Sequence, residues 1–241
     1  MKIKSIFVLG STSLIAQELC LDLAKKGCSR FHLISRDLIK NKPLKEILTK
    51  KYNAFVTEEL INLAETDPNN LNLPEIENFD LYLITAGNLG DNLKAQTNLS
   101  ETNSITRVNY TSLLPWLLSI ANDDRLNTKS SLWIFSSVAA DRGRPSNFVY
   151  GAAKAGLSVF CEGLIAKSQG KPFSIRLIKA GFMMTPMSEG KAPKFLCIKP
   201  KTVVKYLLKN TKKHGTEYLP WWWFIIMKII KLLPLQIIKK L

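Results

Sequence analysis

The chain has 241 residues, 46% of them hydrophobic, and a formal net charge of +15. This length suits one domain with a full core. The four cysteines lack C-x-x-C spacing and the two histidines lie far apart, so we expect reduced, mostly buried thiols and no metal site. The apolar run at residues 6–9 is too short for a secretory signal, and we expect a cytoplasmic protein.

The predicted elements begin with a buried strand over residues 3–9 and an amphipathic helix that ends near residue 26, where Gly27 stops it. A strand, a tight turn and a helix N-terminus form the arrangement that receives a pyrophosphate, because unpaired backbone N–H groups face the anion. Only one of the usual three glycines is present, so an ordinary strand-to-helix turn is the alternative. The residues predicted to contact a dinucleotide here are Gly10, Ser11, Thr12, Ser13, Leu14 and Ile15.

A second strand, predicted over residues 31–34, leads into Ser35, Arg36 and Asp37. In a dinucleotide fold this strand end meets the adenosine ribose, where an acidic side chain binds the 2′-hydroxyl and an arginine favours a 2′-phosphate. Ser35 takes the tip and Arg36 follows it, which favours NADP(H) as the cofactor. Asp37 leaves NAD(H) open, and a solvated loop residue is the alternative for Arg36.

The middle of the chain continues the alternation of strands and helices. The next predicted elements are a helix over 43–51, a strand over 55–61, a polar loop over 66–78, a strand over 81–85 and one long helix over 101–121. Asn62 and Leu63 follow the third strand, and Ala86 and Gly87 follow the fourth. Residues as small as these two let a backbone lie against a flat ring. The long helix carries Asn109, for which a satisfied core amide is the alternative to a catalytic role.

The stretch between residues 137 and 156 carries the candidate chemistry. A buried strand predicted over 131–135 precedes Ser137, and a helix running to about residue 167 holds Tyr150 and Lys154. Positions i and i+4 share one helix face, so the phenol and the ammonium point into the same space. A nearby cation is expected to lower the pKa of the phenol, and a tuned phenol beside a ketone is a general acid. Since Y-x-x-x-K alone is a weak motif, a surface tyrosine–lysine pair is the alternative.

The last predicted elements of this domain are a strand over 174–178, a helix over 201–210 and a short strand over 216–219. Strands alternating with helices predict an α/β fold, a Rossmann-type doubly wound parallel sheet in a single domain, with ligands at the C-terminal ends of the strands. The candidate residues expected at that edge are Gly10, Arg36, Gly87, Ser137 and Gly181. Their agreement favours the catalytic interpretation of the tyrosine–lysine pair.

Together these features resemble the short-chain dehydrogenase/reductase family over residues 2–219. The residues that carry the resemblance are Asn109, Ser137, Tyr150 and Lys154. It implies that Tyr150 is the acid/base, that Lys154 lowers its pKa and holds the nicotinamide ribose, and that Ser137 orients the substrate carbonyl. It also implies that Asn109 holds a helix kink and a water of the proton relay. The further cofactor contacts that it implies are Ala86, Gly87, Gly181, Met183 and Thr185.

The sequence departs from the family's pattern around the cofactor. Leu14 and Ala16 stand where the second and third turn glycines are usual, Thr85 replaces an asparagine, and Ala180 replaces a proline. These departures bear on the cofactor geometry more than on the chemistry. Family members usually pair through the helices that carry Asn109 and Tyr150, which implies a homodimer or homotetramer.

Several short motifs resemble one branch of the family, whose members reduce a polyprenyl-phosphate-linked 2-keto sugar. They are G-x-T-S-x-I at 10–15, R-V-N-Y-T at 107–111, S-N-F-V-Y-G at 146–151, K-A-G at 154–156 and an apolar, basic tail. A long-chain 3-keto lipid is the alternative substrate. A nicotinamide-binding module without turnover is the alternative of a different class, and the degenerate glycine turn is its best support.

The predicted division of the chain is a catalytic domain over residues 1–218 and a tail over 219–241. Residues 191–241 contain twelve lysines, one glutamate and no arginine, so this segment carries +11 of the net charge. The uncharged run ends at Met227, which is too short to span a bilayer as a helix. Consecutive tryptophans at 221–223 are typical of a membrane–water interface.

An amphipathic helix lying on the cytoplasmic face of an anionic membrane fits this tail best, with Pro234 dividing it into two short helices. Burial against a second subunit is the alternative, although interface cores are depleted in lysine. We expect no nucleic-acid partner, because the lysine-rich segment has no arginine to read base edges.

Overall fold

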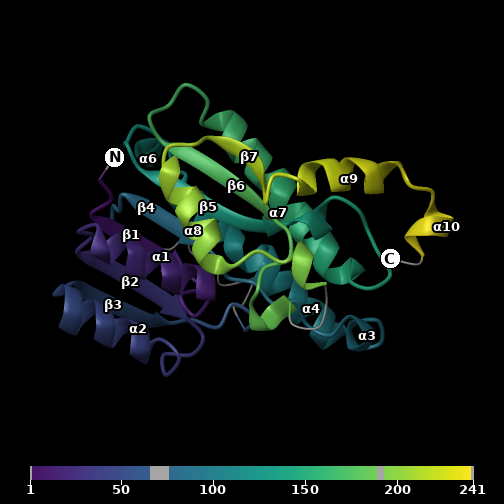
Figure 1. The fold of residues 1–241 in the computed structure, drawn as a ribbon, viewed down its shortest axis with the longest axis horizontal. Helices are drawn as coiled ribbons and strands as arrows, with labels where there is room; N and C mark the ends of the chain where they lie inside the picture. The colour runs from purple at the N-terminus through teal and green to yellow at the C-terminus, as the bar shows by residue number, and fades with distance from the viewer. Residues whose placement is uncertain (1, 66–75, 189–192, 240–241) are drawn as a thin grey trace.

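The computed structural model describes residues 2–65, 76–188 and 193–239. Most of the polar loop predicted over 66–78 therefore lies outside the described residues. Within them, parallel strands form one sheet in the order β3-β2-β1-β4-β5-β6-β7 (Figure 1). The strands are β1 Ser5–Leu9, β2 Arg30–Ser35, β3 Phe55–Leu60, β4 Leu81–Ile84, β5 Ser131–Ser137, β6 Ser174–Ala180 and β7 Gly215–Leu219.

Helices cover both faces of this sheet, which confirms the predicted doubly wound α/β fold (Figure 1). Three helices pack on one face: α1 Leu14–Lys25, α2 Lys42–Glu46 and α8 Pro200–Lys209. The other face is covered by α4 Leu99–Asn109, α5 Leu114–Ile120, α6 Asp123–Leu126 and α7 Phe148–Lys167. The remaining helices are α3 Asn92–Ala95, α9 Trp223–Leu232 and α10 Leu235–Ile238.

Burial explains why the central strands read as continuous apolar runs. Every residue of β1, β4 and β6 is buried, as expected for parallel strands covered on both faces. Below one face Phe31 and Trp133 fill the core, and below the other Phe7 and Tyr82 do so. Cys20, Cys28 and Cys161 are buried, as the sequence predicted. The Cys28 thiol donates to the Arg30 carbonyl at 3.8 Å, and burial raises its pKa to about 11.

The single long helix predicted over residues 101–121 is wrong. The helix α4 ends at Asn109, and Tyr110 leaves the helical conformation with φ −146°. A 3₁₀ turn follows before α5 begins at Leu114. Pro115 accounts for the new start, because it lacks a backbone N–H and suits the first turn of a helix.

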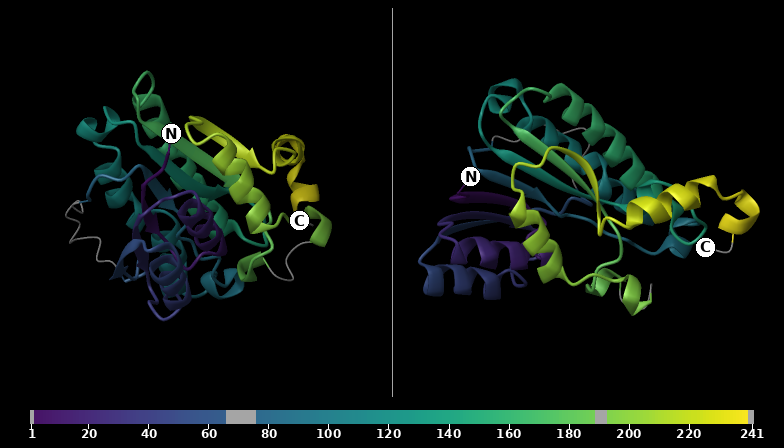
Figure 2. Two further views of the ribbon diagram at one scale, coloured as in Figure 1. Left: turned by 60° about the vertical axis from the view of Figure 1, so that its left-hand side comes forward. Right: turned by 45° about the horizontal axis from the view of Figure 1, so that its top comes forward.

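The tail forms two short helices, α9 and α10, separated at Pro234 as the sequence predicted. The helix α9 follows the C-terminal end of β7, and the tail extends beyond the end of the sheet (Figure 2). One face of α9 is buried on the rest of the chain, where Trp223 and Met227 pack with Val138. The opposite face is exposed and largely apolar.

Candidate active site

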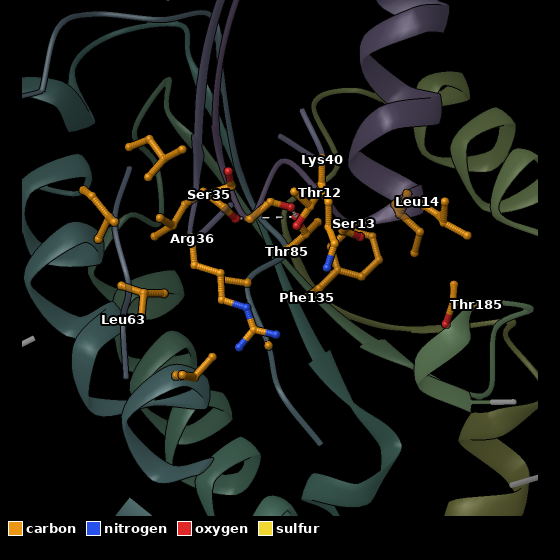
Figure 3. Close-up of a pocket in the computed structure, with 18 of the residues that line it drawn as sticks. Thr12, Ser13, Leu14, Ser35, Arg36, Lys40, Leu63, Thr85, Phe135 and Thr185 are labelled. Carbon is orange, nitrogen blue, oxygen red and sulfur yellow. Dashed lines mark hydrogen bonds between the residues drawn. The ribbon is translucent and has the colours of Figure 1, made fainter. Parts of the chain in front are cut away.

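A cavity of about 500 Å³ opens at the C-terminal edge of the sheet. It lies beside β1, where the strand order reverses between β2 and β4, the place at which doubly wound folds bind ligands. Figure 3 shows residues from the ends of several strands and from the start of α1 around it. The predicted site residues that line it are Gly10, Thr12, Ser13, Leu14, Ile15, Ser35, Arg36, Asn62, Leu63, Ala86, Gly87, Tyr150, Lys154, Met183 and Thr185.

The turn after β1 depends on Gly10. Its φ is +98°, a conformation that L side chains rarely adopt, and a Cβ there would collide with the backbone of Ala86. The Thr85 hydroxyl donates to the Gly10 carbonyl at 2.9 Å and so ties the end of β4 to this turn. Thr85 therefore has a structural partner at the position where the family usually has an asparagine.

Ser11 is the one predicted turn residue whose side chain faces away from the cavity. It is fully buried and donates to the Ile34 carbonyl at 3.1 Å and to Asn41 Oδ1 at 3.0 Å. Its role is to hold the turn against β2. Ser13 precedes α1 and makes no side-chain capping bond, so the first N–H groups of α1 are left for an anion in the cavity.

The end of β2 brings two cations to the cavity, Arg36 and Lys40 (Figure 3). The Asp37 carboxylate accepts the backbone N–H of Lys40 at 3.2 Å and lies 3.5 Å from its ammonium. That backbone hydrogen bond is the main reason why the pKa of Asp37 is lowered. Asp37 does not line the cavity. Lys40 was not predicted from the sequence. The only feature of the sequence that could have indicated it is its position three residues after Asp37.

Tyr150 and Lys154 lie at the floor of the cavity, on one face of α7 as predicted. The Lys154 side chain is almost completely buried; its ammonium donates to the Phe135 carbonyl at 3.2 Å and lies 6.0 Å from the centre of the Tyr150 ring. Burial raises the pKa of Tyr150 to about 12, partly opposed by a hydrogen bond with Ser137. Burial also lowers the pKa of Lys154 to about 8. The predicted lowering of the tyrosine's pKa by the lysine is therefore wrong for this structure, because desolvation of the phenol is the main contribution and raises the pKa.

Ser137 ends β5, and Asn109 ends α4. The Ser137 hydroxyl accepts the backbone N–H of Ala139 at 3.1 Å and begins the 3₁₀ turn Val138–Ala140. The Asn109 amide donates to the carbonyls of Ile105 at 2.8 Å and Asn88 at 2.6 Å, and its oxygen accepts the Asn88 N–H at 3.2 Å. These bonds hold the helix break in place and join it to the segment after Gly87.

Gly181 does not line the cavity, because the tail covers it. The indole of Trp223 packs so closely on Gly181 that a Cβ would collide with the ring. Trp223 is buried, and its Nε1 has no hydrogen-bond partner among the described residues. The sequence analysis assigned this tryptophan to the tail and not to the site. The sequence around residues 221–223 does not predict its contact with Gly181.

A doubly wound sheet with a cavity at the C-terminal ends of its strands, lined by a tyrosine and a lysine from one helix face, has the layout of a dinucleotide-binding fold. The family model of the short chain dehydrogenases matches residues 4–194 of this chain. The protein belongs to that family.

Relatives and solved structures agree with this assignment. The chain is 32% identical over 155 residues to an uncharacterized oxidoreductase of Mycobacterium tuberculosis, a match that spans 63% of this chain and 61% of that protein. A short-chain dehydrogenase from Sphingobium yanoikuyae in complex with NADPH superposes with a TM-score of 0.77 at 16% identity, over 90% of this chain and 88% of that one. A short chain dehydrogenase from Shigella flexneri complexed with NADP gives 0.74 at 18% identity, over 89% and 95%.

Proposed function

We propose that this protein is an NADP(H)-dependent reductase that converts a ketone on a lipid-linked 2-keto sugar into a secondary alcohol at a membrane surface. The observation that carries the chemistry is the presence of Tyr150 and Lys154 in the lining of one cavity, with Ser137, which does not line it, hydrogen-bonded to the Tyr150 phenol.

The residues around the cavity fit a dinucleotide. The turn at Gly10 is a cradle that any Cβ would fill, and the uncapped start of α1 offers N–H groups to a pyrophosphate. Arg36 and Lys40 supply positive charge at the ribose end, while Asp37 is held away by its bond to the Lys40 backbone. This charge favours a 2′-phosphate, and therefore NADP(H) over NAD(H). The bound cofactor supplies the hydride that reduces the ketone.

In the proposed reaction Ser137 and Tyr150 donate hydrogen bonds to the substrate carbonyl oxygen. Tyr150 then gives its proton to that oxygen as the alcohol forms. With its pKa raised by burial to about 12, the phenol is protonated at neutral pH and holds the proton that the carbonyl oxygen receives. Lys154 places a positive charge beside the phenol and stabilises the phenolate that remains.

The substrate class rests on a resemblance and on the position of the tail. The motifs at 10–15, 107–111 and 146–151 resemble those of decaprenylphosphoryl-2-keto-erythropentose reductase. The tail packs beside Gly181 and Val138, at the same edge of the sheet as Tyr150. A long-chain 3-keto lipid is the second candidate substrate, since the same apolar tail would serve it. A binding module without turnover is the candidate of a different class.

The exposed face of the tail fits a membrane surface. Ile225, Ile229 and Leu232 are exposed on α9, with Ile229 56% exposed, and Trp221 and Trp222 flank them. The Lys228 ammonium lies 4.4 Å from the centre of the Phe224 ring, beside this apolar face. An apolar face bordered by tryptophan and lysine suits the headgroup region of an anionic bilayer. Among the described helices, only α7 is long and apolar enough to cross a membrane, and it packs in the core.

Pairing through α4 and α7, which the family resemblance implies, belongs to the same proposal. Val159 is 69% exposed on α7, and an apolar side chain in this position suits a contact between two subunits. Sedimentation of the full chain measures the assembly: a dimer or tetramer supports the pairing and a monomer contradicts it.

The test is NADPH oxidation by the full-length protein in phosphatidylglycerol vesicles that contain a farnesyl-phosphoryl 2-keto-pentose. We expect turnover with this substrate, less with a 3-keto acyl chain, and little with NADH. Turnover of the 3-keto chain alone would support the second substrate, and binding of NADPH without any turnover would support the module.

The membrane is tested separately by co-sedimentation with the same vesicles. Ile225→Ser with Ile229→Ser should reduce binding, whereas Phe55→Ser, on the exposed side of edge strand β3, serves as the matched control. Equal binding by both variants would contradict the membrane assignment.

A further inference from the structure

The loop of residues 141–147 contains two arginines, Arg142 and Arg144, to which the proposed chemistry assigns no role. It joins the 3₁₀ turn Val138–Ala140 to the start of α7. Ser137 begins that turn, and Tyr150 lies in the first turn of α7. The two ends of the loop are held together, because Gly151 packs on Ala139, where an added Cβ would lie 2.9 Å from the carbonyl oxygen. The loop is therefore held next to the segments that carry Ser137 and Tyr150.

This loop lies between the tail and α3. The Arg142 Nη2 group donates to the Leu233 carbonyl, between α9 and α10, at 3.4 Å. On the other side, Asn92 Nδ2 at the start of α3 donates to the Pro145 carbonyl at 2.9 Å. Figure 1 shows α3 and the tail at the same end of the molecule. The loop therefore connects the tail to the segments that carry Ser137 and Tyr150.

The two arginines carry charge without a carboxylate partner in the described part of the chain. Arg142 Nε and Arg144 Nε are both buried and make no hydrogen bond there. The adjacent acid, Asp141, does not neutralise them. Its carboxylate is engaged by Lys179 at 2.8 Å and by the hydroxyl of Tyr218 at 2.6 Å, and Lys231 lies 3.9 Å away. A buried donor atom without a partner is costly, and an anion that binds these half-buried guanidinium groups would supply the missing acceptors.

Two acceptors accompany these donors. Asn92 Oδ1 and Asn147 Oδ1 are buried and have no partner among residues 2–65, 76–188 and 193–239. For Asn92 the orientation of the amide is set, because its Nδ2 already donates to Pro145. The loop and its neighbour thus present guanidinium donors, which match phosphoryl oxygens, next to amide acceptors, which match hydroxyl groups. This combination corresponds to a phosphorylated sugar.

We propose that Arg142 and Arg144 bind the phosphoryl group of the substrate, and that Asn92 and Asn147 accept hydrogen bonds from hydroxyl groups of the attached sugar. The inference rests on the proposed function, because it assigns a subsite to the lipid phosphate beside the reacting ketone. It makes the phosphate the feature that selects this substrate over a long-chain 3-keto lipid, which carries no anion in that place.

The test measures binding without turnover. The full-length protein, saturated with NADP⁺, is titrated by calorimetry with farnesyl phosphate and with farnesol. Wild-type protein should bind the phosphate more tightly than the alcohol. Arg144→Gln and Arg142→Gln should each lower the affinity for farnesyl phosphate by ~10-fold to ~100-fold, which is the loss expected for a charge-assisted hydrogen bond. The affinity for farnesol should be unchanged.

Two further variants serve as controls. Arg144→Lys keeps the charge and should recover part of the affinity for farnesyl phosphate. Arg30→Gln removes an arginine at the start of β2 that pairs with Glu77 at 2.7 Å, and it should bind both ligands as the wild type does. NADPH affinity and melting temperature identify any variant that has lost its fold.

Unchanged affinity of the Arg142 and Arg144 variants for farnesyl phosphate would overturn the proposal, as would an equal loss of both ligands. A parallel arm measures binding to phosphatidylglycerol and phosphatidylcholine vesicles. If these variants no longer bind the anionic vesicles but still bind farnesyl phosphate as the wild type does, the arginines bind lipid headgroups and the substrate subsite is refuted. Failure of the reductase assay alone would refute the proposed function, because the binding result does not depend on turnover.

Discussion

Replacing Lys154 with methionine should stabilise the protein at neutral pH while it removes a charge from the active site. Lys154 is 3% exposed, and burial lowers its pKa from 10.5 to about 8. At 1.36 kcal/mol for each pKa unit, the folded state carries a penalty of about 3 kcal/mol when the lysine is protonated. The variant also loses the hydrogen bond to the Phe135 carbonyl, which reduces the gain in stability by about 1 kcal/mol. A net gain of about 2 kcal/mol remains, or a rise of ~4–8 °C in melting temperature for a chain of this size.

The gain should depend on pH in a defined direction. Below pH 8 the lysine is protonated in both the folded and the unfolded state, so the full penalty applies to the wild type. Between pH 8 and pH 10.5 the unfolded state binds more protons, and wild-type stability rises with pH. Above that range the lysine is neutral in both states, and the advantage of methionine disappears.

Thermal unfolding followed by circular dichroism at pH 7 and near pH 10.5 measures both effects. Lys201→Met is the matched control, because the Lys201 side chain is 75% exposed and its removal should leave the melting temperature almost unchanged. An unchanged or lower melting temperature for Lys154→Met at pH 7 would refute the reasoning. So would a gain of the same size at both pH values.

The remaining predictions concern turnover and cofactor choice. Tyr150→Phe removes the transferable proton and should lower the rate of ketone reduction by ~100-fold or more without changing NADPH affinity in a fluorescence titration; unchanged turnover would exclude Tyr150 as the acid. Arg36→Ala should lower the affinity for NADPH by ~10-fold or more relative to the affinity for NADH, because it removes a charge-assisted hydrogen bond to the 2′-phosphate. Lys40→Ala should act in the same direction, and an equal loss of both cofactors would contradict these two assignments.

Local patterns were sufficient for much of the fold. The alternation of apolar strands with amphipathic helices determines the doubly wound sheet, because a parallel strand needs a crossover helix and both faces must be covered. The same alternation places Gly10, Arg36 and Ser137 at one edge of the sheet, since parallel strands end on the same side. Helix periodicity places Tyr150 and Lys154 on one face of α7.

Contacts between distant segments decided the rest. The break after Asn109 is held by its bonds to the carbonyls of Ile105 and Asn88, which the apolar pattern over residues 101–121 does not show, although Pro115 within that range marks the new start of α5. Lys40 joins Arg36 at the cavity only because the chain turns back after β2.

The tail and the titration of the active site depend on tertiary structure in the same way. Trp223 lies against Gly181 although more than forty residues separate them, so this contact is invisible in either segment alone. The pKa of Tyr150 rises because the folded chain removes water from the phenol. The spacing of Tyr150 and Lys154 in the sequence does not predict this burial. Sequence periodicity therefore determined which residues share a face or an edge, whereas burial, close packing and charge depend on distances that exist only once the chain has folded.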